Sequence, residues 1–157
     1  MKSAARQRGL STVEFAIAGF ATIIVLFGVI EIGRLLSTFT TVAETTRRAA
    51  RLAAVCPMND PAIANLALMT SADGNCSSIL PGLCTGNVSI AYLNSTGGAA
   101  TTPSATKFVR VQISGYVHSL FFPLTAMSIT IPPFTTTLPS ESLGYRPELD
   151  ARVCVAG

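Results

Sequence analysis

The sequence predicts an α+β fold in which a long N-terminal helix precedes a small antiparallel β-sheet domain. Residues 15–30 form a run of sixteen residues without a charge, and residues 37–55 lack both Pro and Gly. Beyond residue 56, short alternating segments are separated by stretches rich in Gly, Pro and Ser. With 49% hydrophobic and 12% charged residues, the 157-residue chain is more apolar than a typical soluble domain, so a membrane element is expected.

The uncharged run predicts one transmembrane helix. A bilayer core of about 30 Å needs roughly 20 helical residues, so the span is expected to extend from about Val13 to Leu36. Glu14 and Arg34 then lie near its two boundaries. A cleaved secretory signal would have the same basic start, but no small-x-small cleavage site follows the run and the helical pattern continues.

The charges predict the orientation of the span and exclude one class of partner. Lys2, Arg6 and Arg8 precede the run without an acidic residue, which favours a cytoplasmic N-terminus and an exported C-terminal part. Beyond Gly9, eight basic residues balance eight acidic ones, because three of the eleven Lys and Arg lie in the basic start. No surface for nucleic acid is predicted.

A helical stripe continues the span. Pro57 disfavours helical backbone at Cys56, so the predicted helix runs from about Thr12 to Val55. Its apolar or small positions recur at alternating four- and three-residue spacing, as expected of one buried face. These positions are Leu35, Phe39, Val42, Thr46, Ala49, Ala53 and Cys56.

The C-terminal part is expected to hold one short helix and several strands. Asp60 and Pro61 supply an N-cap and a first-turn proline for a helix that reaches about Met69. Residues 70–86 and 94–106 are rich in turn-forming residues and are predicted to be loops. The predicted strands are Val88–Leu93, Lys107–Val117, Met127–Ile131 and Thr135–Leu138, of which the second has the clearest alternation of apolar and polar residues.

All four cysteines lie in the part that is expected to be exported. An even number of cysteines in an oxidising compartment predicts two disulfides, for which three pairings are possible. We favour Cys76 with Cys84, which closes one loop, and Cys56 with Cys154, which ties the C-terminal end to the long helix. Zinc is the alternative, but the chain has no C-x-x-C and His118 is far from the cysteines in sequence. No metal or other cofactor is predicted.

A glycine after the basic start is followed five residues later by a glutamate, in the segment Gly9-Leu10-Ser11-Thr12-Val13-Glu14-Phe15. This arrangement resembles the processing site of bacterial type IV prepilins. The resemblance implies that a prepilin peptidase cuts between Gly9 and Leu10, and that Glu14 and Phe15 take part in assembly. Two interpretations of Glu14 stay open. Its carboxylate favours the helix dipole and reaches the headgroups, or it pairs with the new amino terminus of its own or a neighbouring subunit.

The pattern of the whole helix resembles TadE-like proteins, which are pseudopilins of tight-adherence (Tad, type IVc) pili. The resemblance covers about the first 55 residues and rests on VEFA at 13–16, GVIEIGRL at 28–35 and AETTRRAARLAA at 43–54. Relatives often carry a proline where this chain has Gly19-Phe20, so the resemblance does not extend to a kink there. It implies a minor pilin or pseudopilin of the bacterial inner membrane that works with other pilins and the inner-membrane assembly platform in pilus biogenesis, adhesion or surface attachment.

Glu31 and Arg34 are three residues apart, so one helical face can hold them as an ion pair. The pair is interpreted either as a local contact that lets the helix leave the lipid or as a contact with a neighbouring pilin helix. The predicted divisions of the chain are a leader at 1–9, a transmembrane and assembly helix at 10–36, its periplasmic continuation at 37–56 and an exported β-rich domain at 57–157.

Two other classes of function remain as alternatives. The first is an uncleaved single-pass envelope protein whose exported domain binds a partner or scaffolds a complex. The second is an envelope hydrolase, but the sequence has no G-x-S-x-G, P-loop or HExxH motif and a single histidine, His118. We therefore predict neither an enzyme nor a small-molecule substrate.

Overall fold

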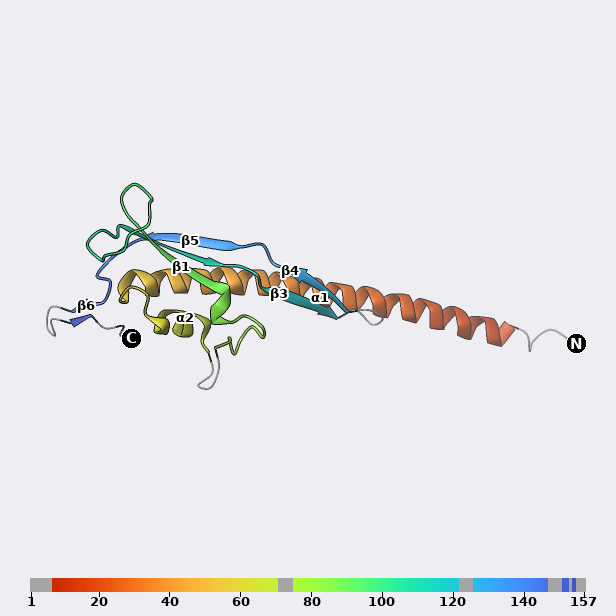
Figure 1. Ribbon diagram of the computed structural model, residues 1–157. Helices are drawn as coiled ribbons and strands as arrows, with labels where there is room; N and C mark the ends of the chain where they lie inside the picture. Colours follow the sequence, from red (N-terminus) through yellow and green to blue (C-terminus); the bar gives the residue numbers. More distant parts are fainter. Residues whose placement is uncertain (1–6, 71–74, 122–125, 147–150, 153, 155–157) are drawn as a thin grey trace, which may run out of the picture.

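A computed structural model describes residues 7–70, 75–121, 126–146, 151–152 and 154 (Figure 1). Within these described residues, the order of elements is one long helix, one short helix, one 3-10 turn and seven strands, all of whose pairings are antiparallel. The predicted α+β class is confirmed. Residues 1–6 of the predicted leader lie outside the described part of the chain.

The long helix α1 (Gln7–Val55) has 49 residues and therefore a length of about 74 Å. It begins five residues before the predicted start at Thr12, because the segment before Thr12 contains no Pro and a single Gly costs a helix only about 1 kcal/mol. The predicted end at Val55 is confirmed. There the Cys56 N–H still donates to the Leu52 carbonyl, at 2.8 Å, before Pro57 redirects the chain.

The two halves of α1 have different surroundings. No residue from 11 to 30 is buried, whereas from Glu31 onward one face of the helix is covered by the rest of the chain. Figure 1 shows the same division, with the N-terminal half projecting from the folded body. Of the predicted stripe, Leu35 and Phe39 are partly buried and the other five positions are buried.

A three-stranded sheet of order β1–β2–β5 lies along the distal half of α1 (Figure 1). The short helix α2 (Pro61–Leu68) lies on a different side of α1 from the sheet. The strands of the sheet are β1 (Val88–Leu93), β2 (Phe108–Ile113) and β5 (Phe134–Pro139). The bounds of β1 agree with the prediction, and those of β5 extend it by one residue at each end. The predicted cap of α2 is also present, since Asp60 Oδ1 accepts from the Ala62 N–H at 2.9 Å.

The core consists of two clusters between α1, α2 and the sheet. Alanines on α1 leave room for β2 to lie close to the helix, and Val109 and Val111 of β2 are fully buried against them. The first cluster contains Ala49, Ala50, Ala53, Cys56, Ile63, Ala67, Tyr92, Val109, Val111 and Leu143. The second contains Val42, Leu68, Leu80, Leu83, Ile113, Tyr116 and Ile131.

The single strand predicted over Lys107–Val117 is wrong. Strand β2 ends at Ile113, and the chain turns through Gly115, whose φ of +72° interrupts extended backbone. A separate strand, β3 (Val117–Phe121), then pairs with β4 (Ala126–Thr130) in a two-stranded hairpin. The short pair β6 (Tyr145–Arg146) and β7 (Ala151–Arg152) was also not predicted, because two-residue strands leave no periodic pattern in a sequence.

Candidate functional site

The N-terminal half of α1 presents a continuous apolar surface. Its best 18-residue window has a mean hydropathy of 2.4 and is 6% buried in the fold. Among its large side chains, Phe15 is 80% exposed and Ile17 is 66% exposed. A surface of this kind is unstable in water and fits a single helix that crosses a membrane, where lipid or neighbouring helices cover it.

The residues of the predicted processing site lie in the first turns of α1. The peptide bond between Gly9 and Leu10 is within the helix, and Glu14 lies on its exposed surface four residues after Leu10. Residues at this separation occupy the same face of a helix. Positions 10 and 14 therefore lie on the same side of α1.

Glu31 and Arg34 form the predicted ion pair, but the pair has a third partner. The Arg34 Nη1 atom lies 2.6 Å from Glu31 Oε1, and Glu31 Oε2 accepts from the backbone N–H of Phe121 at 3.2 Å. The Arg34 guanidinium also lies 5.4 Å from the centre of the Phe121 ring. Glu31 is 5% exposed. This one carboxylate therefore joins α1 to strand β3.

A second polar contact joins the same two elements two turns further along α1. The Thr38 hydroxyl lies 3.3 Å from His118 Nδ1 and donates to the Arg34 carbonyl at 3.0 Å. His118 is buried on β3, and its Nε2 has no hydrogen-bond partner among the described residues. Contacts at Glu31 and Thr38 together fix the β3–β4 hairpin, residues 117–121 and 126–130, against the middle of α1.

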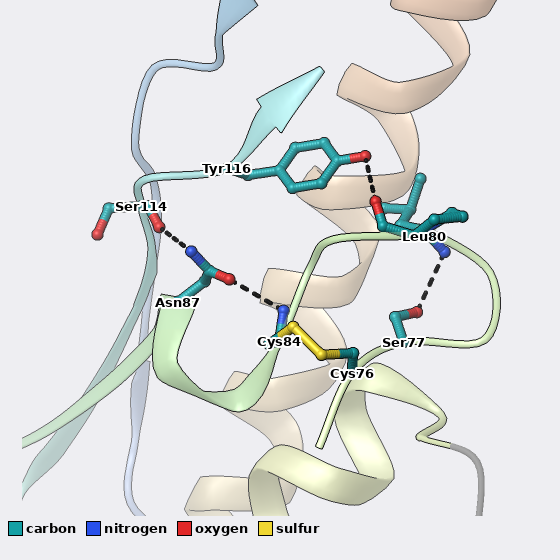
Figure 2. Close-up of a disulfide and its surroundings, with 8 residues drawn as sticks. Cys76, Ser77, Leu80, Cys84, Asn87, Ser114 and Tyr116 are labelled. Atoms are coloured by element: carbon teal, nitrogen blue, oxygen red, sulfur yellow. Dashed lines mark hydrogen bonds between the residues drawn. A yellow bond between two sulfur atoms is a disulfide. The ribbon is translucent and has the colours of Figure 1, made fainter. Parts of the chain in front are cut away.

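An open cavity of about 520 Å³ lies beside this contact, lined in part by Arg34, Tyr116 and His118. The Tyr116 hydroxyl donates to the Pro81 carbonyl at 3.3 Å, and burial raises the pKa of Tyr116. Figure 2 shows this tyrosine above the loop that carries Leu80. The cavity is thus walled by α1, by β3 and by the loop before β1.

Two disulfides hold the loops of the domain, with the pairing that the sequence favoured. Cys76 is bonded to Cys84 within the loop before β1, and Cys56 is bonded to Cys154, 98 residues away. Figure 2 shows that the Asn87 side chain connects the Cys76–Cys84 disulfide loop to the chain after β2. It accepts a hydrogen bond from the Cys84 N–H at 2.9 Å and donates one to the Ser114 carbonyl at 3.1 Å. The second bridge ties the C-terminal segment to the end of α1.

No group of three or more His, Cys, Asp or Glu residues that could hold a metal ion occurs in the part of the chain that the structure describes. The cysteines are all in disulfides. The described residues therefore form a long apolar helix, polar contacts between that helix and β3 at Glu31 and Thr38, and a disulfide-bonded domain around the distal half of the helix.

Residues 9–51 match the family model of TadE-like proteins. The predicted resemblance to TadE-like proteins is confirmed over this segment. Comparison with curated proteins and with solved structures found no match.

The TadE-like segment contains every assembly residue that the sequence predicted. It begins at Gly9, includes Glu14 and the Glu31–Arg34 pair, and ends within the buried part of α1. Its N-terminal portion is the exposed apolar half of the helix, and its C-terminal portion is the part that the sheet and α2 cover. The disulfides and all strands lie outside the match.

The role of β3 in this site was not predicted from the sequence. Neither interpretation of Glu31, as a local pair or as an intersubunit contact, included a partner 90 residues away in the same chain. The available signal was Gly115, which interrupts the predicted strand and makes β3 a separate element. The contact itself was not predictable, because a backbone N–H is present at every non-proline residue and nothing in the sequence marks the one that reaches Glu31.

Proposed function

We propose that this chain is a pseudopilin, or minor pilin, of a Tad-type (type IVc) pilus. The observation that carries the proposal is the TadE-like match over residues 9–51, which coincides with an exposed apolar half-helix and the start of its buried continuation. In the membrane, lipid covers the apolar half. During assembly, helices of other pilins cover the same surface, and the disulfide-bonded domain is displayed outward.

The proposal gives the chain an N-terminus in the cytoplasm and its β domain in the periplasm. The charges support this orientation, because Lys2, Arg6 and Arg8 precede the span without an acidic residue. Disulfides between Cys56 and Cys154 and between Cys76 and Cys84 suit an oxidising compartment.

In this proposal a prepilin peptidase removes residues 1–9. Cleavage after Gly9 leaves a positively charged amino group on Leu10, four residues and about 6 Å along the axis from Glu14. An uncompensated carboxylate at the edge of the membrane is costly, and pairing with that amino group in its own or a neighbouring subunit removes the cost. Such pairing sets the axial position of one helix against another.

The role is structural and carries no catalysis or cofactor. Its partners are the prepilin peptidase, other pilins and pseudopilins, and the inner-membrane assembly platform, and its output is pilus biogenesis, adhesion or surface attachment. The alternative is an uncleaved single-pass envelope protein that scaffolds a complex. The cavity beside Arg34 and His118 is the observation that favours a ligand-binding or scaffolding domain.

The test is incorporation of Glu14→Ala into pili sheared from cells, with Glu44→Ala as a matched control. Glu44 is an exposed acid on the distal half of the same helix, where it pairs with Arg47 at 3.5 Å. We expect the Glu14 variant to be inserted in the membrane and cleaved as in the wild type but to fall several-fold in the pilus fraction. The Glu44 variant should be incorporated normally. Equal incorporation of both variants would refute the pairing role of Glu14.

A further inference from the structure

The β3–β4 hairpin carries an apolar surface that the fold leaves uncovered. Residues 111–140, which include the hairpin, contain no Asp, Glu, Lys or Arg. Four of its large apolar side chains are exposed, namely Val117 at 49%, Phe121 at 63%, Met127 at 56% and Ile129 at 38%. An exposed two-stranded hairpin of this composition is unusual on a surface that faces only water.

Both sides of the hairpin contribute to this surface. His118 and Leu120 face α1 and are buried, whereas Val117 and Phe121 lie on the other face of β3. Both remain largely exposed, although the Phe121 ring lies beside the Arg34 guanidinium. On the paired strand, Met127 lies opposite Leu120 on the side that faces α1, yet it remains exposed. Strand β4 therefore leaves Met127 and Ile129 uncovered on the face that it shares with Leu120 and His118, and β3 leaves Val117 and Phe121 uncovered on the other face.

The position of this surface along α1 identifies what covers it. The Phe121 N–H binds Glu31, so the end of β3 is level with Glu31. Counting from Glu14 as the inner boundary, 20 helical residues, or about 30 Å, reach Arg34. Phe121 thus lies at the outer edge of the hydrocarbon layer, and Ile30, which precedes Glu31, is 58% exposed and belongs to the span.

We propose that the β3–β4 hairpin dips into the outer interface of the membrane that α1 crosses and gives the chain a second contact with lipid. This inference rests on the membrane insertion of the proposed function. Phe121 and Met127 enter the boundary between acyl chains and headgroups, where apolar side chains gain free energy by leaving water. The backbone groups at the hairpin edges remain within reach of headgroups and interfacial water, which a deeper position would deny them.

The buried Glu31 joint is consistent with this position. A carboxylate at the edge of the hydrocarbon is costly unless paired, and Arg34 and the Phe121 N–H supply both partners from within the chain. The hairpin therefore shields the one acidic group of the outer end of the span while presenting its apolar side chains to lipid. It holds the β domain against the membrane surface until the subunit leaves the bilayer.

The experiment uses tryptophan fluorescence, because the chain contains no tryptophan. The full-length variants Phe121→Trp and Met127→Trp are placed separately in nanodiscs that hold one chain each, so that a second copy cannot cover the hairpin. Quenching by phosphatidylcholine with brominated acyl chains is compared with Phe20→Trp in the span and with Phe108→Trp. Phe108 is 40% exposed at the end of β2 away from the hairpin.

We expect the Trp at 121 or at 127 to be quenched at least twofold more strongly than the Trp at 108, and the Trp at 20 to be quenched most. If the Trp at 20 is quenched while those at 121 and 127 resemble that at 108, the hairpin contact is wrong and the span stands. A blue-shifted emission at 121 without quenching would indicate a protein environment and would also overturn the lipid contact. If the Trp at 20 is unquenched, the span fails and the hairpin contact fails with it.

Discussion

Glu31 joins α1 to strand β3 through its side chain. Its two carboxylate oxygens bind different elements, Arg34 on α1 and Phe121 on β3. Replacement by Ala keeps the helix intact, since Ala has the highest helix propensity, but leaves the Phe121 N–H without its acceptor. We expect amide hydrogen exchange at Phe121 to accelerate roughly tenfold or more.

Glu44→Ala is the control for this prediction. Glu44 also pairs with an arginine three residues later, but its side chain is 55% exposed and the N–O distance is 3.5 Å. An exposed pair contributes little to stability. Exchange at Phe121 should therefore be unchanged in that variant. Unchanged exchange in Glu31→Ala would mean that apolar packing alone holds β3 on α1.

Because of Tyr92, the stability of the domain should decrease at alkaline pH. Burial raises the pKa of Tyr92 above its ordinary value of 10.0, and the Asp60 carboxylate acts in the same direction, against a hydrogen bond from the Asn59 N–H at 3.2 Å. In the folded state the phenol therefore keeps its proton to higher pH than in the unfolded state. The stability that this provides is complete below about pH 10 and is lost as pH rises through the raised pKa.

Tyr92→Phe tests this statement by urea unfolding of the full chain in detergent. At pH 8 the variant should lose about 1 kcal/mol of unfolding free energy, because the Asn59 N–H loses its acceptor. Above about pH 10 the wild type should lose stability more steeply than the variant, so that the difference between them narrows. Parallel curves over this range would contradict the assignment. Tyr116, whose pKa burial also raises, should respond in the same direction.

The residues of the site were predictable only where their partners are close in sequence. Three-residue spacing predicted the Glu31–Arg34 pair, and the number and positions of the cysteines allowed the observed pairing to be favoured. The Phe121 contact was not predictable, because its donor is a backbone N–H that carries no side-chain signal. The exposure of Glu14 says nothing of a partner in another subunit, so its pairing role stays a prediction.

At the scale of elements, Gly144 controls how the C-terminal segment lies against the end of α1. Its φ is +79°, and a Cβ there would lie 2.6 to 2.8 Å from the Cδ, Cγ and N atoms of Pro57. Gly144→Ala should therefore lower the unfolding free energy by about 3 kcal/mol through backbone strain and overlap together. Chemical unfolding monitored by circular dichroism measures this loss.

Gly82→Ala separates the two causes. Gly82 has a similar φ of +88°, but its nearest atom to a Cβ is 3.9 Å away, on Tyr116. The expected loss is about 1 kcal/mol, from the backbone conformation alone. Equal losses in the two variants would show that overlap with Pro57 contributes nothing.

Elements with strong periodicity were predicted well, and those that depend on turns were not. The end of α1, the start of α2 and the bounds of β1 follow from Pro57, from the Asp60-Pro61 pair and from local alternation. The division of Lys107–Val117 into β2 and β3 depends on Gly115 and on the hydrogen bond from the Ser114 N–H to the Asn87 carbonyl. That second contact is made by a residue 27 positions away, which a local pattern cannot indicate.

At the scale of the whole molecule, the helix is divided between two environments. Among the residues that the structure describes, α1 is buried on one face from Glu31 onward, and no position from 11 to 30 is buried. The hydrophobic run predicted this division, because a stretch without charges cannot remain exposed to water. The sequence also predicted one exported domain, but not that its β3–β4 hairpin reaches back to the outer end of the span.

The most direct test of the proposed function is the intact mass of this chain in pili sheared from cells. A pseudopilin that is processed after Gly9 should be present in that fraction and should begin at Leu10, and deletion of the prepilin peptidase should leave the uncut chain in the membrane. A chain that keeps residues 1–9 in wild-type cells and is absent from the pili would contradict the account.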